Sequence, residues 1–446
     1  MIPMLPPPSA ESPDCFGSAE TDLVPPFPGQ MTCTVIEGNR AWLGGVLQMA
    51  AEERLAVLSY CIASHRAMFP SLLWGGIQSW IRTERSQSVF SPASLRPRDI
   101  LESRRADAHM RSLAIALLAA LPLACQRQQE VAIDPAQLAV FAPLPASVPS
   151  EANPATPAKV ELGWRLYYET QLSADRSQSC NSCHMLDAYG AESEPVSTGV
   201  TGEKGGRNAP TVYNAAGHIA QFWDGRAPDV EEQAKGPILN PIEMGMSSPD
   251  AVLARLVKIP GYRDAFTAAF PDDPKPLTYD NLGRAIGAFE RQLLTPSRWD
   301  KYLQGDQTAL TTAEKQGLKV FLEMGCQGCH NGPFMGGRTF QRLGVVQPWP
   351  DTKDIGRFRV TQAAADSMVF KVPSLRNIAK TPPYFNAGSV LSLDEGVRLM
   401  ARHQLGKELT KEQITSIMTF LQALTGDVPA QYVAPPPPFG STGSGT

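Results

Sequence analysis

Two copies of one five-residue pattern are the part of this sequence whose residue types and spacing could perform chemistry. In each copy, two cysteines stand three positions apart, and a histidine directly follows the second cysteine. The six residues are Cys180, Cys183, His184, Cys326, Cys329 and His330. In a chain of this composition, one such match is expected by chance about 0.002 times, so two copies are not accidental.

The spacing of each pattern suits covalent attachment of a haem. Two thiols on one helical turn can form thioethers to both vinyl groups of a haem, and the adjacent imidazole can then bind the iron. CxxC pairs also bind zinc, but a zinc site does not require a histidine after both pairs. A thioredoxin-like redox site needs only one cysteine pair. The two patterns therefore predict two c-type haems.

An amphipathic helix is predicted before each pattern, with the sequence KVELGWRLYYE before the first and EKQGLKVFLE before the second. The two similar helix-and-pattern segments indicate an internal duplication. Further helix starts are predicted at Thr156, Ser248 and Thr278, where a capping residue meets an apolar period. Three capping boxes pair Thr311 with Glu314, Ser392 with Glu395, and Thr410 with Gln413. The 40 prolines and 36 glycines indicate long loops. The predicted fold is mainly α, with two cytochrome-c-like haem domains and long loops.

Length and composition set the wider limits. The chain has 446 residues, so at least two compact units are expected. An apolar fraction of 43% excludes a wholly disordered chain, and a charged fraction of 19% excludes a long charged coiled coil. The net charge of −4 lacks the basic footprint of a nucleic-acid binder, so no nucleic-acid partner is expected. Eight cysteines are too few for a disulfide scaffold in a chain of this length.

One apolar segment resembles an export signal. It runs from 113 to 124, follows Met110 and Arg111, and ends at Cys125. It is too short to span a bilayer and suits a secretory h-region. We therefore expect Met110 to be the native start, 110–125 to be a secretory signal, and 1–109 to be a non-native or uncharacterised extension. The alternative is a genuine N-terminal domain followed by a short buried helix.

The residues before Cys125 resemble a lipoprotein cleavage box, with Pro122 where leucine is usual. A lipid at Cys125 would anchor the mature protein to a membrane. The Pro/Ala-rich stretch 126–157 is predicted to be a linker, and 429–446 a disordered tail. Because bacterial c-type haem is attached after export, the predicted location is the periplasm.

From about residue 158 to 428, the chain resembles the bacterial di-haem cytochrome c peroxidases, a family that also includes the MauG-type enzymes. The matching stretches are GGRNAPTVYN, QFWDGRAPDVEEQAKGPILNPIEM, AIGAFERQL, DIGRFRVT, FKVPSLRN, PPYF and MARHQLG. The resemblance implies a peroxidatic haem domain at 158–305 around His184, and an electron-transfer haem domain at 306–428 around His330. A passive electron carrier would have no reason to carry the middle stretches.

The resemblance also assigns roles to single residues. Glu243 matches the family's catalytic carboxylate, which would move a proton between the two oxygens of peroxide. Gln233 and Pro237 match positions that line the same pocket. Trp223 matches a tryptophan between the haems, where an aromatic ring can relay an electron and also pack.

Two further sites rest on the resemblance. Met400 matches the axial methionine of the electron-transfer haem, where a thioether raises the potential. A methionine on an amphipathic helix is otherwise core packing, and His403, one turn further on, is the competing ligand. Asn208, Thr381 and Pro383 match a calcium site, in which the Asn side chain and two backbone carbonyls bind the ion together with waters.

Two residues depart from the family pattern. Val200 occupies the position of a histidine that closes the peroxidatic iron in the peroxidases that require reductive activation. Because valine has no lone pair, we expect the all-ferric enzyme to react with peroxide directly. Asn386 replaces the histidine of the common PYFH, a change for which the sequence offers no physical account.

Together these features predict an enzyme that reduces hydrogen peroxide to water in the periplasm, with electrons from a small cytochrome c or cupredoxin. The alternative function is a MauG-like oxidase that uses peroxide to modify aromatic side chains of a partner protein. MauG has a tyrosine where this chain has Met400. A third function is passive electron transfer, which predicts two closed, six-coordinate haems. The expected partners also include a second copy of the chain, as a homodimer.

Overall fold

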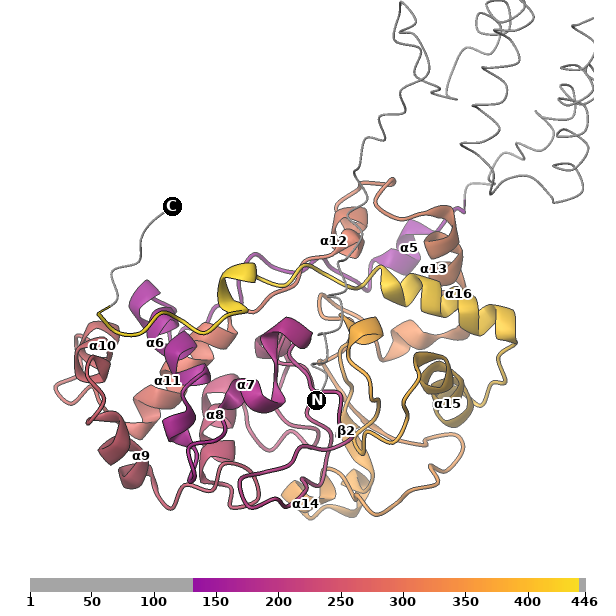
Figure 1. The fold of residues 1–446 in the computed structure, drawn as a ribbon. Coiled ribbons are helices and arrows are strands. Elements are labelled where there is room, and N and C mark those ends of the chain that lie inside the picture. Colours follow the sequence, from indigo (N-terminus) through magenta and orange to yellow (C-terminus); the bar gives the residue numbers. More distant parts are fainter. Residues whose placement is uncertain (1–130, 441–446) are drawn as a thin grey trace, which may run out of the picture. The chain divides into compact units, whose positions relative to one another are not determined.

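The computed structural model describes residues 131–440, and Figure 1 shows their arrangement. These residues belong to one compact unit of the chain, which begins at Pro122. The predictions for 1–109, for 110–125 with its lipid site Cys125, and for 126–130 lie outside the described residues. Within the described part, no helix is long and apolar enough to cross a membrane.

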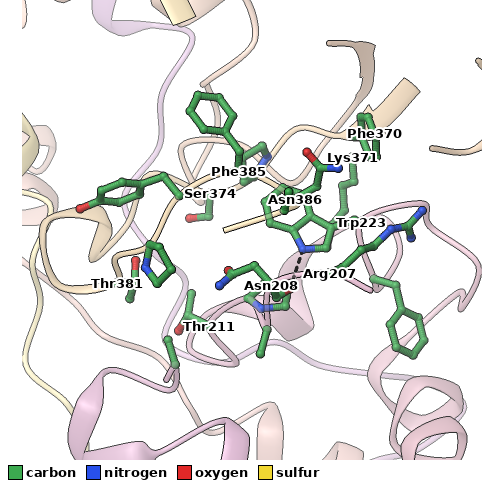
Figure 2. Close-up of a pocket in the computed structure, with 18 of the residues that line it drawn as sticks. Arg207, Asn208, Thr211, Trp223, Phe370, Lys371, Ser374, Thr381, Phe385 and Asn386 are labelled. Carbon is green, nitrogen blue, oxygen red and sulfur yellow. Dashed lines mark hydrogen bonds between the residues drawn. The ribbon is translucent and has the colours of Figure 1, made fainter. Parts of the chain in front are cut away.

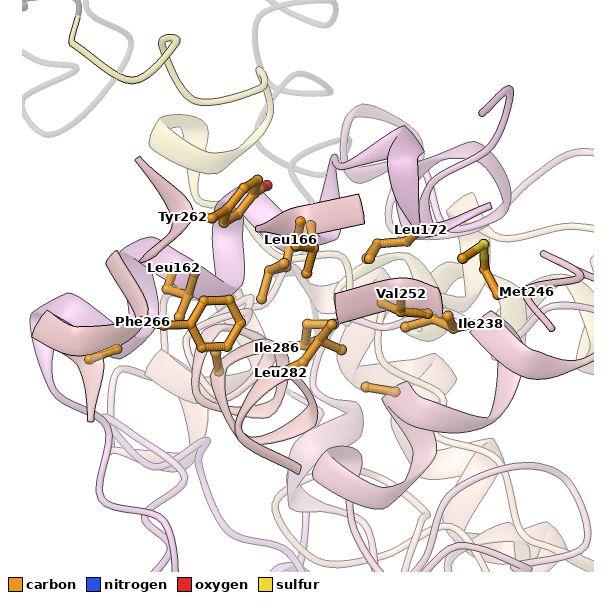
Figure 3. Close-up of a cluster of buried hydrophobic side chains, with 14 of the residues drawn as sticks. Leu162, Leu166, Leu172, Ile238, Met246, Val252, Tyr262, Phe266, Leu282 and Ile286 are labelled. Atoms are coloured by element: carbon orange, nitrogen blue, oxygen red, sulfur yellow. The ribbon is translucent and has the colours of Figure 1, made fainter. Parts of the chain in front are cut away.

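The first half of the described unit is a helical bundle around a buried hydrophobic core. Its helices are α6 (Pro157–Tyr167), α8 (Val230–Leu239), α9 (Pro249–Leu256), α10 (Tyr262–Ala269) and α11 (Tyr279–Glu290). Helix α11 packs against both α6 and α8. Gly163 permits the approach of α6 to α11, because a Cβ there would overlap the carbonyl oxygen of Ala285. The core residues in Figure 3 include Leu162, Leu166, Phe266, Leu282 and Ile286.

The second half repeats this design around a separate core. Its helices are α12 (Arg298–Leu303), α13 (Thr312–Met324), α15 (Leu393–Leu405) and α16 (Lys411–Gln422). Helix α13 packs along α16, and Gly317 permits this approach because a Cβ there would overlap the carbonyl oxygen of Ser416. Each cysteine pattern therefore follows a helix that packs closely on a second helix at a glycine: α6 on α11 in the first half, and α13 on α16 in the second half. This shared arrangement corresponds to the internal duplication of the sequence.

Short elements and long loops make up the rest of the unit. The short helices are α5 (Pro135–Leu138), α7 (Cys180–Cys183) and α14 (Phe358–Thr361). Strands β1 (Phe340–Arg342) and β2 (Val369–Lys371) form an antiparallel pair. The 3₁₀ turns are Thr170–Leu172, Leu186–Ala188, Ala215–Gly217, Cys326–Gly328, Ala364–Asp366, Ile378–Lys380 and Ala430–Tyr432. The predicted helical, loop-rich fold is confirmed for the described residues.

Most of the predicted helix starts form as expected. Capping hydrogen bonds are made by Thr156, Ser248, Thr278, Thr311 and Thr410. The predicted box at Ser392 and Glu395 is wrong, because the side chain of Ser392, which precedes α15, accepts no capping hydrogen bond from the helix backbone. The carboxylate of Glu395 pairs instead with the guanidinium of Arg398, one turn along the same helix.

The prediction of a disordered tail at 429–446 is wrong for its described part, residues 429–440. Tyr432 packs edge-on against Trp164 and Phe289, with ring centroids 5.5 and 5.0 Å apart. Phe439 packs against Tyr262 at 5.0 Å. The aromatic rings attach this segment to α6, α10 and α11, and these contacts could not be read from its proline content.

The predicted linker and domain boundary also need correction. In the segment 126–157, Phe141 is buried against Trp299 at 5.3 Å, and the backbone N–H of Leu144 donates to Asp300 at 2.7 Å. Because α12 buries Trp299 in the second core, the second domain begins before residue 298 rather than at 306. Asp300 also accepts hydrogen bonds of 2.7 and 2.9 Å from Arg376, in a buried ion pair.

Candidate functional site

One cavity of about 1240 Å³ contains both cysteine patterns and the other predicted site residues. The predicted residues on its wall are Cys180, Cys183, His184, Asn208, Trp223, Gln233, Pro237, Glu243, Cys326, Cys329, His330, Thr381, Pro383 and Met400. These residues lie on separate helices and loops of both halves. The tertiary structure therefore brings together groups that are up to 220 positions apart, Cys180 and Met400 being the two ends of that span.

The first pattern forms the short helix α7, which starts after Ser179. Both thiols are free, and burial raises the pKa of Cys180 to about 12. The Nδ1 atom of His184 lies 3.0 Å from the carbonyl oxygen of Pro210. A carbonyl only accepts hydrogen bonds, so Nδ1 carries the proton and Nε2 keeps its lone pair. Burial lowers the pKa of His184, which keeps the imidazole neutral and able to bind iron.

The second pattern has the same chemistry in a 3₁₀ turn. The thiols of Cys326 and Cys329 are free, and burial raises the pKa of Cys326 to about 11. The Nδ1 atom of His330 lies 3.4 Å from the carbonyl oxygen of Met335, and burial lowers the pKa of His330 to about 4. Its Nε2 therefore also keeps its lone pair. Within residues 131–440, no three histidine, cysteine or acidic side chains cluster as they do in a zinc site.

Two thiols beside a neutral imidazole on the cavity wall fit a covalently bound haem at each pattern. When bound, each haem would be held by its two cysteines through thioethers and by its histidine through Nε2. Met400 of α15 lies on the cavity wall, whereas His403 does not. The Nδ1 atom of His403 lies 3.1 Å from the carbonyl oxygen of Gln347, and its ring packs edge-on against Trp349.

Glu243 lies in the turn that follows α8, with its side chain on the cavity wall. Its Oε1 accepts a hydrogen bond of 2.8 Å from Nδ2 of Asn240. Burial raises the pKa of Glu243, although this hydrogen bond and the charge of Arg226 oppose the shift. A carboxyl whose pKa moves toward neutral pH can accept a proton and then return it, as general acid–base catalysis requires.

The loop that carries Val200 is attached to the Glu243 turn. The backbone N–H of Val200 donates to the carbonyl oxygen of Glu243 at 2.9 Å. Gly199 permits this close approach, because a Cβ there would overlap the carbonyl oxygen of Ile242. Val200 itself is not on the cavity wall, and its side chain packs toward Gly245.

The centre of the cavity wall is a network around Trp223, shown in Figure 2. The indole Nε1 of Trp223 donates to the carbonyl oxygen of Asn208 at 2.9 Å. The backbone N–H of Asn208 donates to the carbonyl oxygen of Asn386 at 2.8 Å. Nδ2 of Asn386 donates to Asp354 at 2.9 Å, and Asp354 pairs with Arg207. The amide at 386 thus anchors a carboxylate, which gives this departure from the family pattern a structural role.

Sequence reasoning missed two buried residues on the same wall, Lys371 and Glu290, and the half-buried His218. Lys371 and His218 lie 3.2 Å apart through Nζ and Nδ1. Glu290, at the end of α11, is buried, and burial raises its pKa to about 8. Lys371 and Glu290 occur within the matching stretches FKVPSLRN and AIGAFERQL, so only the apolar neighbours of these charges could have indicated that they are buried.

Comparison with known proteins gives a consistent picture. The sequence profile of the di-haem cytochrome c peroxidase family matches residues 157–308. The cytochrome c551 peroxidase of Pseudomonas aeruginosa is 44% identical over 298 residues, which cover 65% of this chain and 86% of that protein. The cytochrome c peroxidase Ccp of Escherichia coli is 43% identical over 289 residues, which cover 64% of this chain and 60% of that longer protein.

MauG-type proteins are similar as well. The methylamine utilization protein MauG of Methylophilus methylotrophus is 30% identical over 299 residues, covering 63% of this chain and 87% of that protein. The crystal structure of a MauG-like protein associated with microbial copper homeostasis matches with a TM-score of 0.58 and 29% identity, covering 66% of this chain and 95% of that one. With its two haem-attachment patterns on one shared cavity, this chain belongs to the di-haem cytochrome c peroxidase family.

Proposed function

We propose that this protein reduces hydrogen peroxide to water with electrons from a small redox protein. The observation that carries the proposal is the placement of Glu243, a half-buried carboxyl with a raised pKa, on the cavity wall that also holds both haem-attachment patterns. Each peroxide takes up two electrons and two protons and yields two waters. When bound, the haem held by Cys180, Cys183 and His184 would supply an iron centre for this chemistry, and the haem held by Cys326, Cys329 and His330 would supply an electron.

Glu243 handles the protons. Its carboxylate takes a proton from one peroxide oxygen and returns it to the other, so that water leaves rather than hydroxide. Asn240 holds Oε1 of Glu243 through the 2.8 Å hydrogen bond and thereby fixes the direction of the carboxylate. Gln233 and Pro237, both on α8, line the same wall and limit the space around the reacting oxygens.

The second half of the protein provides the electron reservoir. Met400 would supply a thioether ligand to the haem held by Cys326 and Cys329, which would stabilise the ferrous iron and raise the potential of that haem. The position of His403, held by the Gln347 carbonyl and away from the wall, favours Met400 as that ligand. Trp223 relays the electron between the halves, supported by its hydrogen bond to Asn208.

Three finer features belong to the same proposal. Asn208, Thr381 and Pro383 bind a calcium ion with one amide and two carbonyl oxygens, and their common place on the wall supports this. Val200 leaves the peroxidatic iron accessible, supported by its side chain packing toward Gly245. The protein acts in the periplasm, as a homodimer and with a lipid anchor at Cys125, and its donor is a cytochrome c or cupredoxin that docks weakly.

The second candidate function is peroxide-driven oxidation of aromatic residues in a partner protein. The identity of 30% to a protein named MauG favours it. Met400 on the cavity wall, where MauG has tyrosine, favours the peroxidase. A passive electron carrier would not need a proton-transferring carboxyl such as Glu243 on the cavity wall.

Steady-state peroxide consumption with a panel of reduced small cytochromes and cupredoxins tests the proposal. We expect turnover that is stoichiometric with donor oxidation, two donors per peroxide. Peroxide consumption that requires a protein substrate and leaves the donors reduced would establish the oxidase function instead. The absence of any turnover by the fully haem-loaded protein would support the passive carrier.

A further inference from the structure

Lys371 is a buried cation that has no anionic partner within residues 131–440. It ends strand β2 and is 8% exposed. No carboxylate of the described residues lies within ion-pair distance of its Nζ. Its recorded side-chain partner is Nδ1 of His218 at 3.2 Å. A buried ammonium without a counter-charge is costly, so such a group usually has an anion to bind.

His218 holds this ammonium in place without neutralising it. A lysine ammonium can only donate hydrogen bonds, so the charged form of Lys371 donates to Nδ1 of an uncharged His218 that carries its proton on Nε2. Burial lowers the pKa of His218 well below its usual range, and the charge of Lys371 adds to that shift. The ring packs edge-on against Phe334 and closely over Gly337, where a Cβ would overlap it. The imidazole is thus fixed by packing, and it fixes Nζ.

The position of Lys371 points to the second haem. Lys371 lies on the wall of the shared cavity, and Figure 2 shows it close to Trp223 and Asn386. The chain continues from β2 into residues 372–375, which line the cavity too. Phe334 and Gly337, which pack against His218, lie four and seven residues after His330 of the second cysteine pattern.

A haem in this cavity brings two propionate carboxylates, and a buried carboxylate needs a charge partner as much as a buried ammonium does. We propose that Lys371, positioned by His218, binds a propionate of the haem attached at Cys326 and Cys329. This inference rests on the proposed occupation of the cavity by two covalent haems. Burial lowers the pKa of Lys371 to about 7 when no anion is present, and a bound propionate would retain its charge.

The proposal has a consequence for the redox balance of the enzyme. A fixed positive charge near a haem stabilises the reduced form, which carries one positive charge fewer than the oxidised form. Lys371 would therefore act with Met400 to keep the second haem reducible. Lys371→Met removes the charge and preserves most of the side-chain volume.

Spectroelectrochemical titration of the purified di-haem protein tests this. In Lys371→Met, the one-electron equilibrium constant for reduction of the second haem should fall about tenfold, which is about 59 mV for one electron. The potential of the first haem should not change. Lys371→Arg keeps the charge and should keep most of the potential. The matched control is Lys353→Met, because Lys353 lines the same cavity but is exposed, and its removal should shift neither haem.

An unchanged potential in Lys371→Met with both haems attached would overturn the proposal, and so would a shift confined to the first haem. If Lys371→Met fails to attach both haems, His218→Leu replaces it. That variant keeps the charge but removes its anchor, so the second haem's potential should fall by a smaller amount, and no shift would overturn the proposal. The titration uses neither peroxide nor donor protein, so its result is independent of whether the peroxidase function is correct.

Discussion

Replacing Glu243 by glutamine separates the proton-transfer role of this residue from its structural role. Glutamine has the same shape, and its Oε1 can still accept the 2.8 Å hydrogen bond from Asn240. The backbone carbonyl of residue 243, which accepts from Val200, is unaffected. The turn and the haem sites should therefore persist, and only the exchangeable proton is lost.

The expected loss follows from the size of general acid–base catalysis. Turnover should fall about 10²–10⁴-fold, which is about 2.7–5.4 kcal/mol of transition-state stabilisation. The pH profile gives a second signature. Burial raises the pKa of Glu243 above the ordinary glutamate value of 4.5, and the proton acceptor is the ionised form. In the parent enzyme, kcat/KM should therefore fall as the pH drops through this raised pKa, and the variant should lack that acid limb.

The assay is stopped-flow peroxide reduction at saturating donor, with haem content and spectra measured for each variant. The matched control is Glu192→Gln, because Glu192 lies on the same cavity wall and its pKa is also raised by burial, but its partner is the hydroxyl of Ser197. The control should remain close to the parent rate. Equal rates for Glu243→Gln and the parent would refute the assignment, as would an acid limb that persists in Glu243→Gln.

Three further predictions test other parts of the structure, two of them with a control variant. Val200→His should make the first haem low-spin and dependent on prior reduction, whereas the parent should react with peroxide in the all-ferric state. Electronic absorption and EPR spectra of the ferric proteins measure the spin state. A parent protein that is low-spin and inert to peroxide until it is reduced would contradict the prediction. Met400→His should lower the potential of the second haem by on the order of 0.1 V, whereas His403→Ala should leave it unchanged in redox titration. Asp300→Asn should lower the free energy of unfolding, measured in urea, by about 3–5 kcal/mol, because it leaves the buried guanidinium of Arg376 unpaired. The control Asp280→Asn removes the exposed pair with Lys235 and should lower it by only about 0–1 kcal/mol.

The sequence by itself determined the cofactor chemistry and the class of fold. Two cysteines and a histidine at fixed spacing specify haem attachment through local geometry alone, because all three groups lie on one turn. Capping residues such as Thr156 and Thr311 likewise mark helix starts through hydrogen bonds within four residues. The predicted box at Ser392 did not form, because the carboxylate of Glu395 pairs with Arg398, another residue of the same helix.

Only the tertiary structure decided how distant residues combine. The sequence favours Met400 over His403 through the family resemblance alone, whereas the packing of α15 puts Met400 on the cavity wall and His403 against Trp349. Composition predicted a free linker and tail, but Phe141 and Tyr432 find apolar surfaces that are assembled only in the fold.

The burial of charged side chains also could not be predicted from the sequence. The pKa of Lys371 or of Glu290 depends on how much water the folded chain excludes from around it, and that exclusion comes from residues far away in sequence. Spacing along the chain encodes interactions within a few residues, whereas burial and long-range contacts exist only once the two halves have closed around their common cavity.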